Sequence, residues 1–344
     1  MMKAWRLHGV SDLNKDSQPL KAAELPIPDP GTGEILIRIA CCGICHTELD
    51  EIEGRTTPLY YPVIPGHQVI GYVHKLGQEA NRFAIGDRVG VAWIYSACGT
   101  CEYCLRGLEN LCPEFRATGR DANGGYAEYM VVHENFAYAI PDVFSDAEAA
   151  PLLCAGAIGY RSLKLAGLQD GDTLGLTGFG ASGHLVLQMA KHLYPSSRIV
   201  VFARSPEEQA FARSLGAYWA GNTSDTPPFQ AHAIIDTTPV WTPVLNALHH
   251  LKPGGRLVIN VIRKEPADRH VLLELRYPDH LWMEKEIKSV ANLTRGDVSD
   301  FLKLAAAIPL RPEIARYPFE MANQALVDLK RKNATKGAKV LVME

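Results

Sequence analysis

The sequence predicts an α/β protein with two domains, one rich in β structure and one built on a doubly wound parallel sheet. Two observations support this prediction. The chain has 344 residues, which is long for one hydrophobic core and suits two. The pattern of apolar residues also changes near Ala147, from short β-branched runs among Gly and Pro to helical stretches alternating with apolar strands.

The elements expected on the two sides of this change differ in kind. In the first part we expect compact β structure with long loops, and the strand candidates are residues 34–40, 69–73 and 88–92. In the second part strands alternate with helices, as in βαβ units. The expected strands are 173–177, 199–202, 233–236 and 256–261, and the expected helices are 188–194, 206–215 and 241–250. After Lys288 we expect another apolar strand, a helix at 298–307 and a closing apolar run at 338–343.

Composition excludes several classes of partner. Hydrophobic residues make up 47% of the chain and charged residues 21%, and no apolar run approaches the ~18 residues of a membrane span. The net charge is -3, with no block of Lys or Arg to attract nucleic acid or a membrane surface. The N-terminus has no apolar segment of the secretory type. We therefore expect a soluble, cytoplasmic protein that binds neither nucleic acid nor membrane.

Half of the eight cysteines fall within one short segment, CGTCEYCLRGLENLC. Disulfides suit a cytoplasmic protein badly. The C-x2-C-x2-C opening is similar to that of a ferredoxin, but the next cysteine follows after seven residues rather than three. Zinc is favoured over an iron-sulfur cluster, and four thiolates would fill its coordination and leave a structural ion. The predicted ligands of this structural zinc are Cys98, Cys101, Cys104 and Cys112.

A glycine-rich loop joins the expected strand 173–177 to a helical stretch beginning at His184. In GFGASG, Gly178 would permit a tight turn, Gly180 would let a pyrophosphate approach the backbone, and Gly183 would let the helix pack closely on the strand. Strand, glycines and helix in this order favour dinucleotide binding over an incidental turn.

The next strand indicates which dinucleotide is bound. About twenty residues after the glycines, NAD-binding proteins usually carry an acidic residue that bonds the ribose. Here the strand ends with Ala203, Arg204 and Ser205. Arg204 could pair with a 2'-phosphate and Ser205 could add a hydroxyl, so NADP(H) is favoured over NAD(H). The alternative is that Arg204 is a solvated loop residue.

Five separated segments together resemble those of the zinc-dependent medium-chain alcohol dehydrogenases. They are GICHTELD, PGHQVIG, the four-cysteine segment, LLCAG and SVANLTRGD, in this order, with GFGASG before the last. The resemblance spans nearly the whole chain. It implies a GroES-like catalytic domain at residues 1–148 and 289–344, a Rossmann domain at 149–288, and an active-site zinc in the cleft between them.

The resemblance implies a second zinc per chain, a catalytic one, with Cys45, His67 and Cys154 as its protein ligands. Two thiolates and one imidazole leave the fourth position open, as a catalytic zinc requires. The alternatives are that Cys45 is a small buried apolar residue, as most free cysteines are, and that His67 is structural. We interpret Cys41 and Cys42 as packing residues.

The chain departs from the family pattern beside two of these ligands. Gln68 follows His67 where many relatives have glutamate, and an amide adds no negative charge near the metal. We expect a somewhat stronger Lewis acid as a result. Glu48 stands where an aspartate commonly orients the histidine ligand, and its longer side chain could still reach.

A third departure concerns proton transfer. The resemblance implies that Thr47 takes the proton of the substrate alcohol and passes it through the cofactor ribose toward a histidine three residues later. Asp50 stands at that position and, if solvated, is a weaker base than imidazole. Either Asp50 accepts the proton in an altered environment or the proton goes directly to water.

Three further residues take roles from the resemblance alone. His46 corresponds to a position near the cofactor pyrophosphate, and Arg295 to a phosphate-binding position. Trp93 corresponds to a wall of the substrate pocket, although a core aromatic is nearly as good an interpretation. A bulky indole there would favour small or flat alcohols and aldehydes.

The sequence is thus interpreted as an enzyme that moves a hydride between a primary alcohol, or its aldehyde, and NADP(H) or NAD(H). The alternatives are a polyol or secondary-alcohol dehydrogenase on the same scaffold, and a dinucleotide-binding protein that retains only its structural zinc. The resemblance also implies a homodimer or homotetramer.

Overall fold

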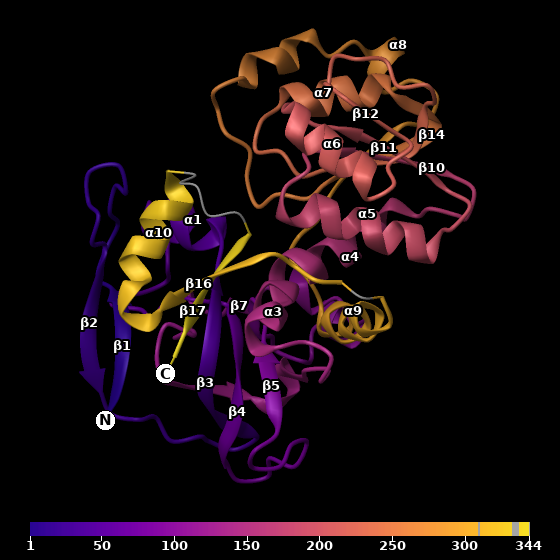
Figure 1. Ribbon diagram of the computed structural model, residues 1–344. Helices are drawn as coiled ribbons and strands as arrows, with labels where there is room; N and C mark the ends of the chain where they lie inside the picture. Colours follow the sequence, from indigo (N-terminus) through magenta and orange to yellow (C-terminus); the bar gives the residue numbers. More distant parts are fainter. Residues whose placement is uncertain (309, 332–336, 344) are drawn as a thin grey trace. The chain divides into compact units, whose positions relative to one another are not determined.

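The computed structural model describes residues 1–308, 310–331 and 337–343. The chain divides into two compact units (Figure 1). Unit 1 comprises Met1–Cys154 and Leu293–Glu344, and unit 2 comprises Ala155–Asn292. The predicted α/β fold class is confirmed, because unit 1 is built mainly of β-strands and unit 2 contains a parallel sheet with helices. The units divide a few residues after the boundaries expected from the sequence.

The sheet of unit 1 has β3 near its centre. Within the described residues its strand order is β16-β17-β3-β4-β5-β9, and β8 pairs with the first half of β3. Strand β17 runs antiparallel to β3 with Lys339 opposite Ile44, so the chain's last strand flanks the residue before Cys45. The bounds are β3 (Glu34–Ile44), β4 (Gln68–Leu76), β5 (Arg88–Val91), β8 (Tyr129–His133), β9 (Ala137–Ala139), β16 (Ile314–Pro318) and β17 (Ala338–Val342).

Shorter elements of unit 1 surround this sheet. Two strand pairs stand outside it, β1 with β2 and β6 with β7. These strands are β1 (Met2–Leu7), β2 (Leu20–Leu25), β6 (Ile94–Ser96) and β7 (Arg116–Ala117). The helices are α1 (His46–Ile52), α2 (Glu102–Leu105), α3 (Asp146–Pro151), α9 (Arg295–Ala307) and α10 (Ala322–Lys330).

Unit 2 is a doubly wound parallel sheet of the Rossmann type. Its strand order is β12-β11-β10-β13-β14-β15, and all five pairings are parallel. The order reverses between β10 and β13, and right-handed crossovers then put the connecting helices on opposite faces. The strands are β10 (Thr173–Thr177), β11 (Arg198–Phe202), β12 (Trp219–Gly221), β13 (Ala231–Asp236), β14 (Leu251–Ile259) and β15 (Glu286–Ser289). The helices are α4 (Ala157–Ala166), α5 (Ala181–Leu193), α6 (Pro206–Ser214), α7 (Thr242–His249) and α8 (Tyr277–His280).

Two local predictions are wrong. The apolar strand expected after Lys288 is absent from the described residues there, since β15 ends at Ser289 and residues 290–294 are irregular. Val290 and Leu293 are apolar because they are buried, not because they belong to a strand. The helix after the glycine loop begins at Ala181, one turn earlier than expected, because Gly180 already serves as its N-cap.

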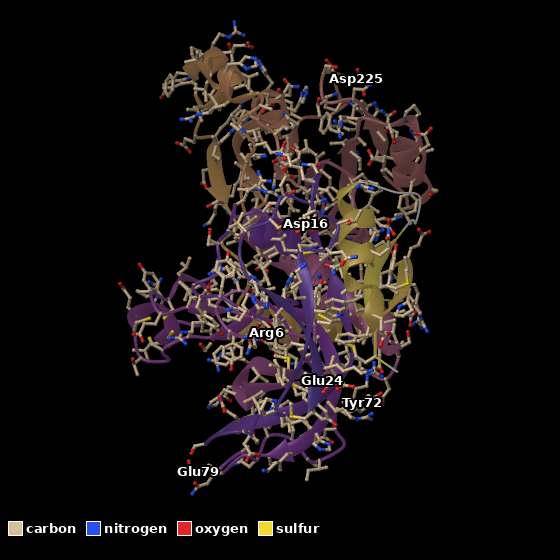
Figure 2. The ribbon with its side chains drawn as sticks, turned by 90° about the vertical axis from the view of Figure 1, so that its left-hand side faces the viewer. Arg6, Asp16, Glu24, Tyr72, Glu79 and Asp225 are labelled. Atoms are coloured by element: carbon tan, nitrogen blue, oxygen red, sulfur yellow. The ribbon has the colours of Figure 1, made fainter. Side chains whose placement is uncertain are left out.

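One connection in unit 2 is unusually short. Between β12 and β13 the chain crosses in residues 222–230, and these form no helix. At its middle, exposed Asp225 projects from unit 2, as exposed Glu79 does at a loop tip of unit 1 (Figure 2).

Under α7, an apolar cluster joins this helix to β13 and β14 through Ile234, Leu248 and Leu257. Among the described residues, no helix is both long and apolar enough to span a membrane.

Candidate active site

The first candidate metal ligand, Cys45, is placed by the way α1 begins. Cys45 is the N-cap, and its Sγ accepts a hydrogen bond from the backbone N–H of Thr47 at 3.4 Å. In return the Glu48 carboxylate accepts the backbone N–H of Cys45 at 2.8 Å. This is a capping box with a thiol in the place usually taken by Ser or Thr. Cys45 is therefore fixed just where β3 ends and the helix starts.

Glu48 also reaches the second candidate ligand. Its other oxygen, Oε1, lies 2.5 Å from Nδ1 of His67, which precedes β4. Both side chains are buried. Because Nδ1 is occupied by this bond, Nε2 is the ring nitrogen left to bind a metal ion. It lies 3.7 Å from Sγ of Cys45. A carboxylate that holds the far side of a ligand imidazole is the usual outer support of a metal-binding histidine.

The third candidate ligand arrives from a distant part of the sequence. Cys154 lies in a π-helical turn, Leu152–Gly156, that follows α3 and Pro151. Proline has no N–H to donate, so it loosens the helical bonding where the turn widens. Sγ of Cys154 lies 4.0 Å from Sγ of Cys45.

The structure therefore brings Cys45, His67 and Cys154 together. Their donor atoms all lie within 4.8 Å of one another. Two sulfurs and one imidazole nitrogen fit a zinc ion, and they leave a fourth position for a small ligand.

Two of the three side chains in this cluster have raised pKa values. The hydrogen bond to Cys154 and burial together raise the pKa of the Cys45 thiol well above its usual range. Burial alone would lower the pKa of His67, but the neighbouring Glu48 and Cys45 raise it well above its ordinary value. Zinc binds thiolates and neutral imidazole, so loading the cluster must release protons.

The four-cysteine segment forms a second cluster. All eight cysteines, every one within the described residues, are free thiols. The Sγ atoms of Cys98, Cys101, Cys104 and Cys112 lie within 4.8 Å of one another, and that of Cys98 is 3.5 Å from that of Cys112. Backbone N–H groups of Thr100 and Cys101 lower the pKa of Cys98 to about 6. Four converging sulfurs fit a closed, tetrahedral zinc site.

The two candidate proton-transfer residues, Thr47 and Asp50, lie on α1 in different settings. Thr47 is half-buried, two residues after Cys45. His46, the candidate pyrophosphate contact between Cys45 and Thr47, is exposed. Asp50 is buried, and its Oδ1 accepts a hydrogen bond from Nε of Arg55 at 2.5 Å. Arg55 also pairs with Glu53. Asp50 is thus part of an ion-pair network at the end of α1.

Residues around the three-donor cluster are unusually polar for a protein interior. Gln68 is buried at the start of β4, opposite Gly43 of β3. Glu51, one turn beyond Glu48 on α1, is only 1% exposed, and neither of its carboxyl oxygens has a hydrogen-bond partner among the described residues. Burial, with a contribution from Glu48, raises the pKa of Glu51 well above its usual range. Sequence reasoning missed Glu51, although its i, i+3 spacing from Glu48 was a usable signal.

Trp93, the candidate pocket wall, is half-buried between β5 and β6. Its ring centroid lies 5.6 Å from that of Phe115, and the guanidinium of Arg120 lies 5.2 Å over it. The ring is thus held between an aromatic and a cationic side chain.

In unit 2 the glycine loop has the backbone that the sequence predicts. Gly178 has φ +81°, a conformation that L side chains rarely adopt. A Cβ on Gly183 would lie 2.7 Å from the carbonyl oxygen of Gly178, so only glycine allows this approach. Gly180 has open space around it, and α5 starts directly after it. Such a loop at a helix N-terminus fits a pyrophosphate.

The two candidate residues for recognition of the 2'-phosphate follow β11. Arg204 is exposed. The hydroxyl oxygen of Ser205 accepts the backbone N–H of Glu208 at 3.1 Å and so caps α6. The Ser205 hydroxyl can still donate its own hydrogen.

Arg295 opens α9, in unit 1. Its Nε donates to Oε1 of Glu109 at 2.7 Å, and its guanidinium lies 5.2 Å over the ring of Phe136. Glu109 is buried and lies between Cys104 and Cys112. Sequence reasoning missed Glu109, because nothing local links residues so far apart in the chain.

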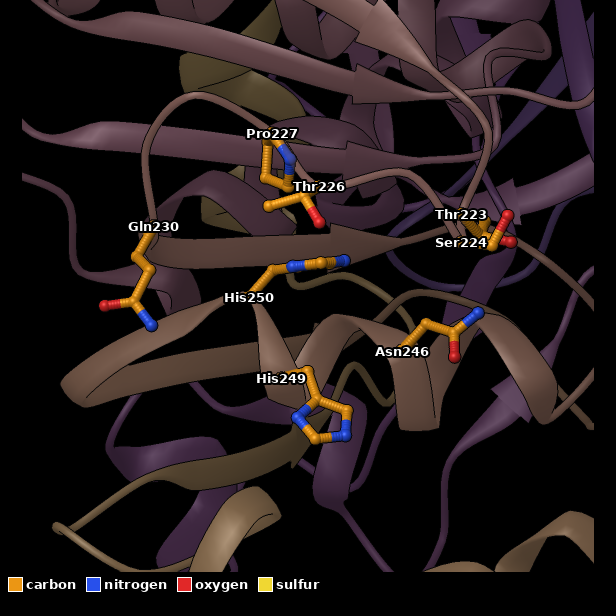
Figure 3. A pocket seen from close by; sticks show the side chains of 8 residues that line it. All are labelled: Thr223, Ser224, Thr226, Pro227, Gln230, Asn246, His249 and His250. Carbon is orange, nitrogen blue, oxygen red and sulfur yellow. The ribbon is translucent and has the colours of Figure 1, made fainter.

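Unit 2 contains a cavity of about 370 Å³ (Figure 3). It lies between the short β12–β13 connection and the end of α7, and it contains no predicted site residue. Its lining residues are Thr223, Ser224, Thr226, Pro227, Gln230, Asn246, His249 and His250.

Comparison with known proteins places the chain in a family. Residues 31–142 match the alcohol dehydrogenase GroES-like domain. The probable alcohol dehydrogenase AdhA of Mycobacterium tuberculosis is 40% identical, over 99% of this chain and 97% of the relative. An alcohol dehydrogenase of Geobacillus stearothermophilus is 34% identical, over 91% of this chain and 92% of the relative. A cinnamyl alcohol dehydrogenase structure from Sorghum bicolor superimposes with a TM-score of 0.80, at 26% identity, covering 99% of this chain and 97% of that one.

A GroES-like unit with two sulfur-rich clusters that could each hold a metal ion, in one chain with a Rossmann unit and with alcohol dehydrogenases as relatives, indicates an oxidoreductase. The chain belongs to the zinc-type medium-chain alcohol dehydrogenase family. Its general reaction is therefore alcohol oxidoreduction on small-molecule alcohols or aldehydes.

Proposed function

We propose that this protein is a zinc-dependent dehydrogenase that transfers a hydride between a primary alcohol, or its aldehyde, and NADP(H) in preference to NAD(H). The observation that supports it most is the convergence of Cys45, His67 and Cys154 within 4.8 Å, with a coordination position left over. When bound, zinc supplies a Lewis acid for the substrate oxygen, and the nicotinamide supplies the hydride acceptor or donor.

The chain's own residues prepare the substrate side of this reaction. Cys45, His67 and Cys154 hold the metal, and Glu48 fixes the tautomer and orientation of His67. The hydroxyl of Thr47, two residues after a ligand, relays the proton of the substrate alcohol during oxidation, because it takes that proton as it releases its own toward water. Trp93 restricts the substrate to small or flat molecules.

The dinucleotide side is proposed from unit 2 and from two residues of unit 1. Gly178, Gly180 and Gly183 shape the loop that receives the pyrophosphate. Arg204 pairs with the 2'-phosphate of NADP(H), and Ser205 donates its hydroxyl to the same group. From unit 1, His46 and the outer N–H groups of Arg295 complete the phosphate contacts.

We further propose unit 1 as the catalytic domain, with one catalytic and one structural zinc, and unit 2 as the dinucleotide-binding domain. A homodimer or homotetramer is the proposed assembly, which light scattering would test. A protein that binds dinucleotide and keeps only the four-cysteine zinc would carry about one zinc per chain instead of two.

One experiment tests the substrate and cofactor assignments together. Short, branched and aromatic alcohols and aldehydes are assayed with NADPH and NADH, on protein whose zinc content is measured. We expect the highest kcat/KM with a primary alcohol or its aldehyde and NADP(H). Higher kcat/KM with secondary alcohols or polyols would favour that class instead. Absence of turnover with zinc fully loaded would contradict the proposal.

A further inference from the structure

A buried carboxylate lies beside the glycine turn of unit 2. Asp236 ends β13, is 0% exposed, and stands opposite Thr177, the residue before Gly178. Its Oδ1 accepts hydrogen bonds from the hydroxyls of Thr177 and Thr238, both at 2.7 Å. The carboxylate therefore ties the end of β10 to the loop that follows β13.

The same loop contacts the turn itself. The hydroxyl of Thr237 donates to the carbonyl oxygen of Thr177 at 3.0 Å, and its backbone N–H donates to that oxygen at 2.9 Å. A Cβ on Gly178 would lie 2.6 Å from Oγ1 of Thr237. The positive φ of Gly178 is thus held from one side by the residue after Asp236.

A lysine from a third segment completes the arrangement. Lys264 follows β14, and its side chain is 7% exposed. Its Nζ donates to Oδ2 of Asp236, to the carbonyl oxygen of Thr238 at 2.7 Å and to that of Val240 at 3.0 Å. These three bonds use all three ammonium hydrogens.

Residues next to Lys264 bind the segment after β14 to the segment after β13 at further points. The backbone N–H of Glu265 donates to the carbonyl of Pro239 at 2.7 Å. The Asp268 carboxylate accepts the backbone N–H groups of Trp241 and Thr242, where α7 begins. Segment 264–268 therefore lies along segment 237–242.

The location of this network gives it a function. It lies at the carboxyl ends of β10, β13 and β14, where the strand order reverses and where sheets of this type bind their ligands. A buried ion pair adds little stability compared with apolar side chains packed in the same place. Stability alone therefore does not explain why Lys264 and Asp236 are charged and placed here. The reason offered by the structure is orientation of the adjacent turn.

We propose that Lys264 and Asp236 are a positioning pair that fixes the glycine turn and thereby sets the affinity for the dinucleotide. This inference rests on the proposed function, which supplies the ligand. Neither side chain is assigned a contact with the dinucleotide, and both act through Thr177, Thr237 and Gly178.

The test uses the zinc-loaded, full-length protein. Lys264→Met alone leaves the Asp236 carboxylate buried without its cation, and it could fail to fold. The main variant is therefore the double substitution Lys264→Met with Asp236→Asn, which removes both charges. Lys285→Met is the matched control, because Nζ of Lys285 also joins two backbone carbonyls in unit 2, those of Leu248 and Asp279.

Two quantities are measured on each variant: the Kd for NADPH by calorimetry, and hydrogen exchange of the backbone amides at residues 177–183. For the double variant we expect a Kd raised about tenfold and faster exchange in the turn. For Lys285→Met we expect both quantities to stay at the wild-type value.

Three results decide the question. A folded double variant with wild-type Kd and exchange would overturn the inference. So would an equal rise of Kd in Lys285→Met, since it would indicate general loosening. If wild-type protein bound neither NADPH nor NADH, the proposed function would fail, and exchange in the turn would then decide the positioning role by itself.

Discussion

Oε1 of Glu48 lies 2.5 Å from Nδ1 of His67, while the other oxygen of the same carboxylate accepts the backbone N–H of Cys45. One buried side chain therefore holds two of the three candidate zinc ligands. Glutamate contacts the histidine here as the family resemblance expects of aspartate, and the same side chain closes the capping box of α1.

The substitution Glu48→Gln should weaken zinc binding at the three-donor cluster about 10- to 100-fold, because it removes the charge that supports His67. Competition with a chromophoric chelator measures this affinity. Glu207→Gln, on the exposed side of α6, is the control and should behave as wild type. Equal zinc affinity in the two variants would show that Glu48 serves the helix cap alone.

The two metal clusters should respond differently to the loss of one thiol. Cys101→Ala should remove about one zinc per chain and lower the melting temperature by on the order of 5 °C or more, because that metal holds a loop. Cys45→Ser should reduce zinc at its own site and abolish turnover, but the protein should remain folded. Metal analysis, calorimetry and steady-state kinetics distinguish these outcomes. A Cys101→Ala protein of unchanged stability would contradict the structural role.

Arg204→Ala should lower kcat/KM with NADPH about 10- to 100-fold, since a charged hydrogen bond to phosphate is lost. With NADH, which has no 2'-phosphate, efficiency should not change. Lys191→Ala controls for net charge, since Lys191 is an exposed cation near the end of α5 whose Nζ donates to the carbonyl oxygen of Leu215. A parallel loss with both cofactors would argue against selective recognition of the phosphate.

Thr47 and Asp50 are expected to differ in their effect on rate. Thr47→Ala should lower the rate of alcohol oxidation about 100-fold or more, whereas Thr47→Ser, which keeps the hydroxyl, should retain most of it. Because Arg55 already binds Asp50, we expect Asp50→Asn to cost stability and to leave the pH profile of oxidation unchanged. A shifted profile would identify Asp50 as the proton acceptor instead.

His250 should make the protein less stable in mild acid. Burial lowers the pKa of His250 below its ordinary value of 6.5, and the nearby His249 and Lys285 act in the same direction. Between the lowered pKa and 6.5 the unfolded chain binds more protons than the folded one, so stability falls as pH drops through this window. The ring stacks on Phe202, with centroids 5.1 Å apart.

His250→Phe keeps this stacking and removes the titration. The loss of melting temperature between pH 7 and pH 5 should therefore be smaller in the variant than in wild type. His192→Gln, at an exposed position of α5, is the control. An equal acid sensitivity in all three proteins would exclude His250 as its source.

Features encoded over a few residues could be predicted from the sequence. The spacing of Cys98, Cys101, Cys104 and Cys112 is enough to predict a cluster, and GFGASG after an apolar strand is enough to predict the turn at Gly178. In both, the pattern of neighbouring residues is enough to predict the feature, although residues far along the chain, such as Thr237, also contact the turn at Gly178. The ligand set Cys45, His67 and Cys154 needed the family resemblance, because these residues come from separate elements.

Features that depend on tertiary context could not be predicted. Strand β15 is exposed along its whole length and contains a single apolar residue, Ile287, so it lacks the apolar signal of a buried strand. Conversely, Val290 and Leu293 have the apolar signal without a strand. The bonds of Lys264 to Asp236 and of Arg295 to Glu109 join residues 28 and 186 positions apart, and no local pattern indicates such pairs.

All seven cysteine and histidine residues of the two candidate metal sites belong to unit 1, and Cys154 is the last residue before the chain enters unit 2. The 138 residues of Ala155–Asn292 form one uninterrupted insertion that contributes no metal donor. Replacing Ala155–Asn292 by another dinucleotide-binding unit would remove none of these seven residues, so cofactor preference, which we propose resides in unit 2, could be engineered separately from metal loading.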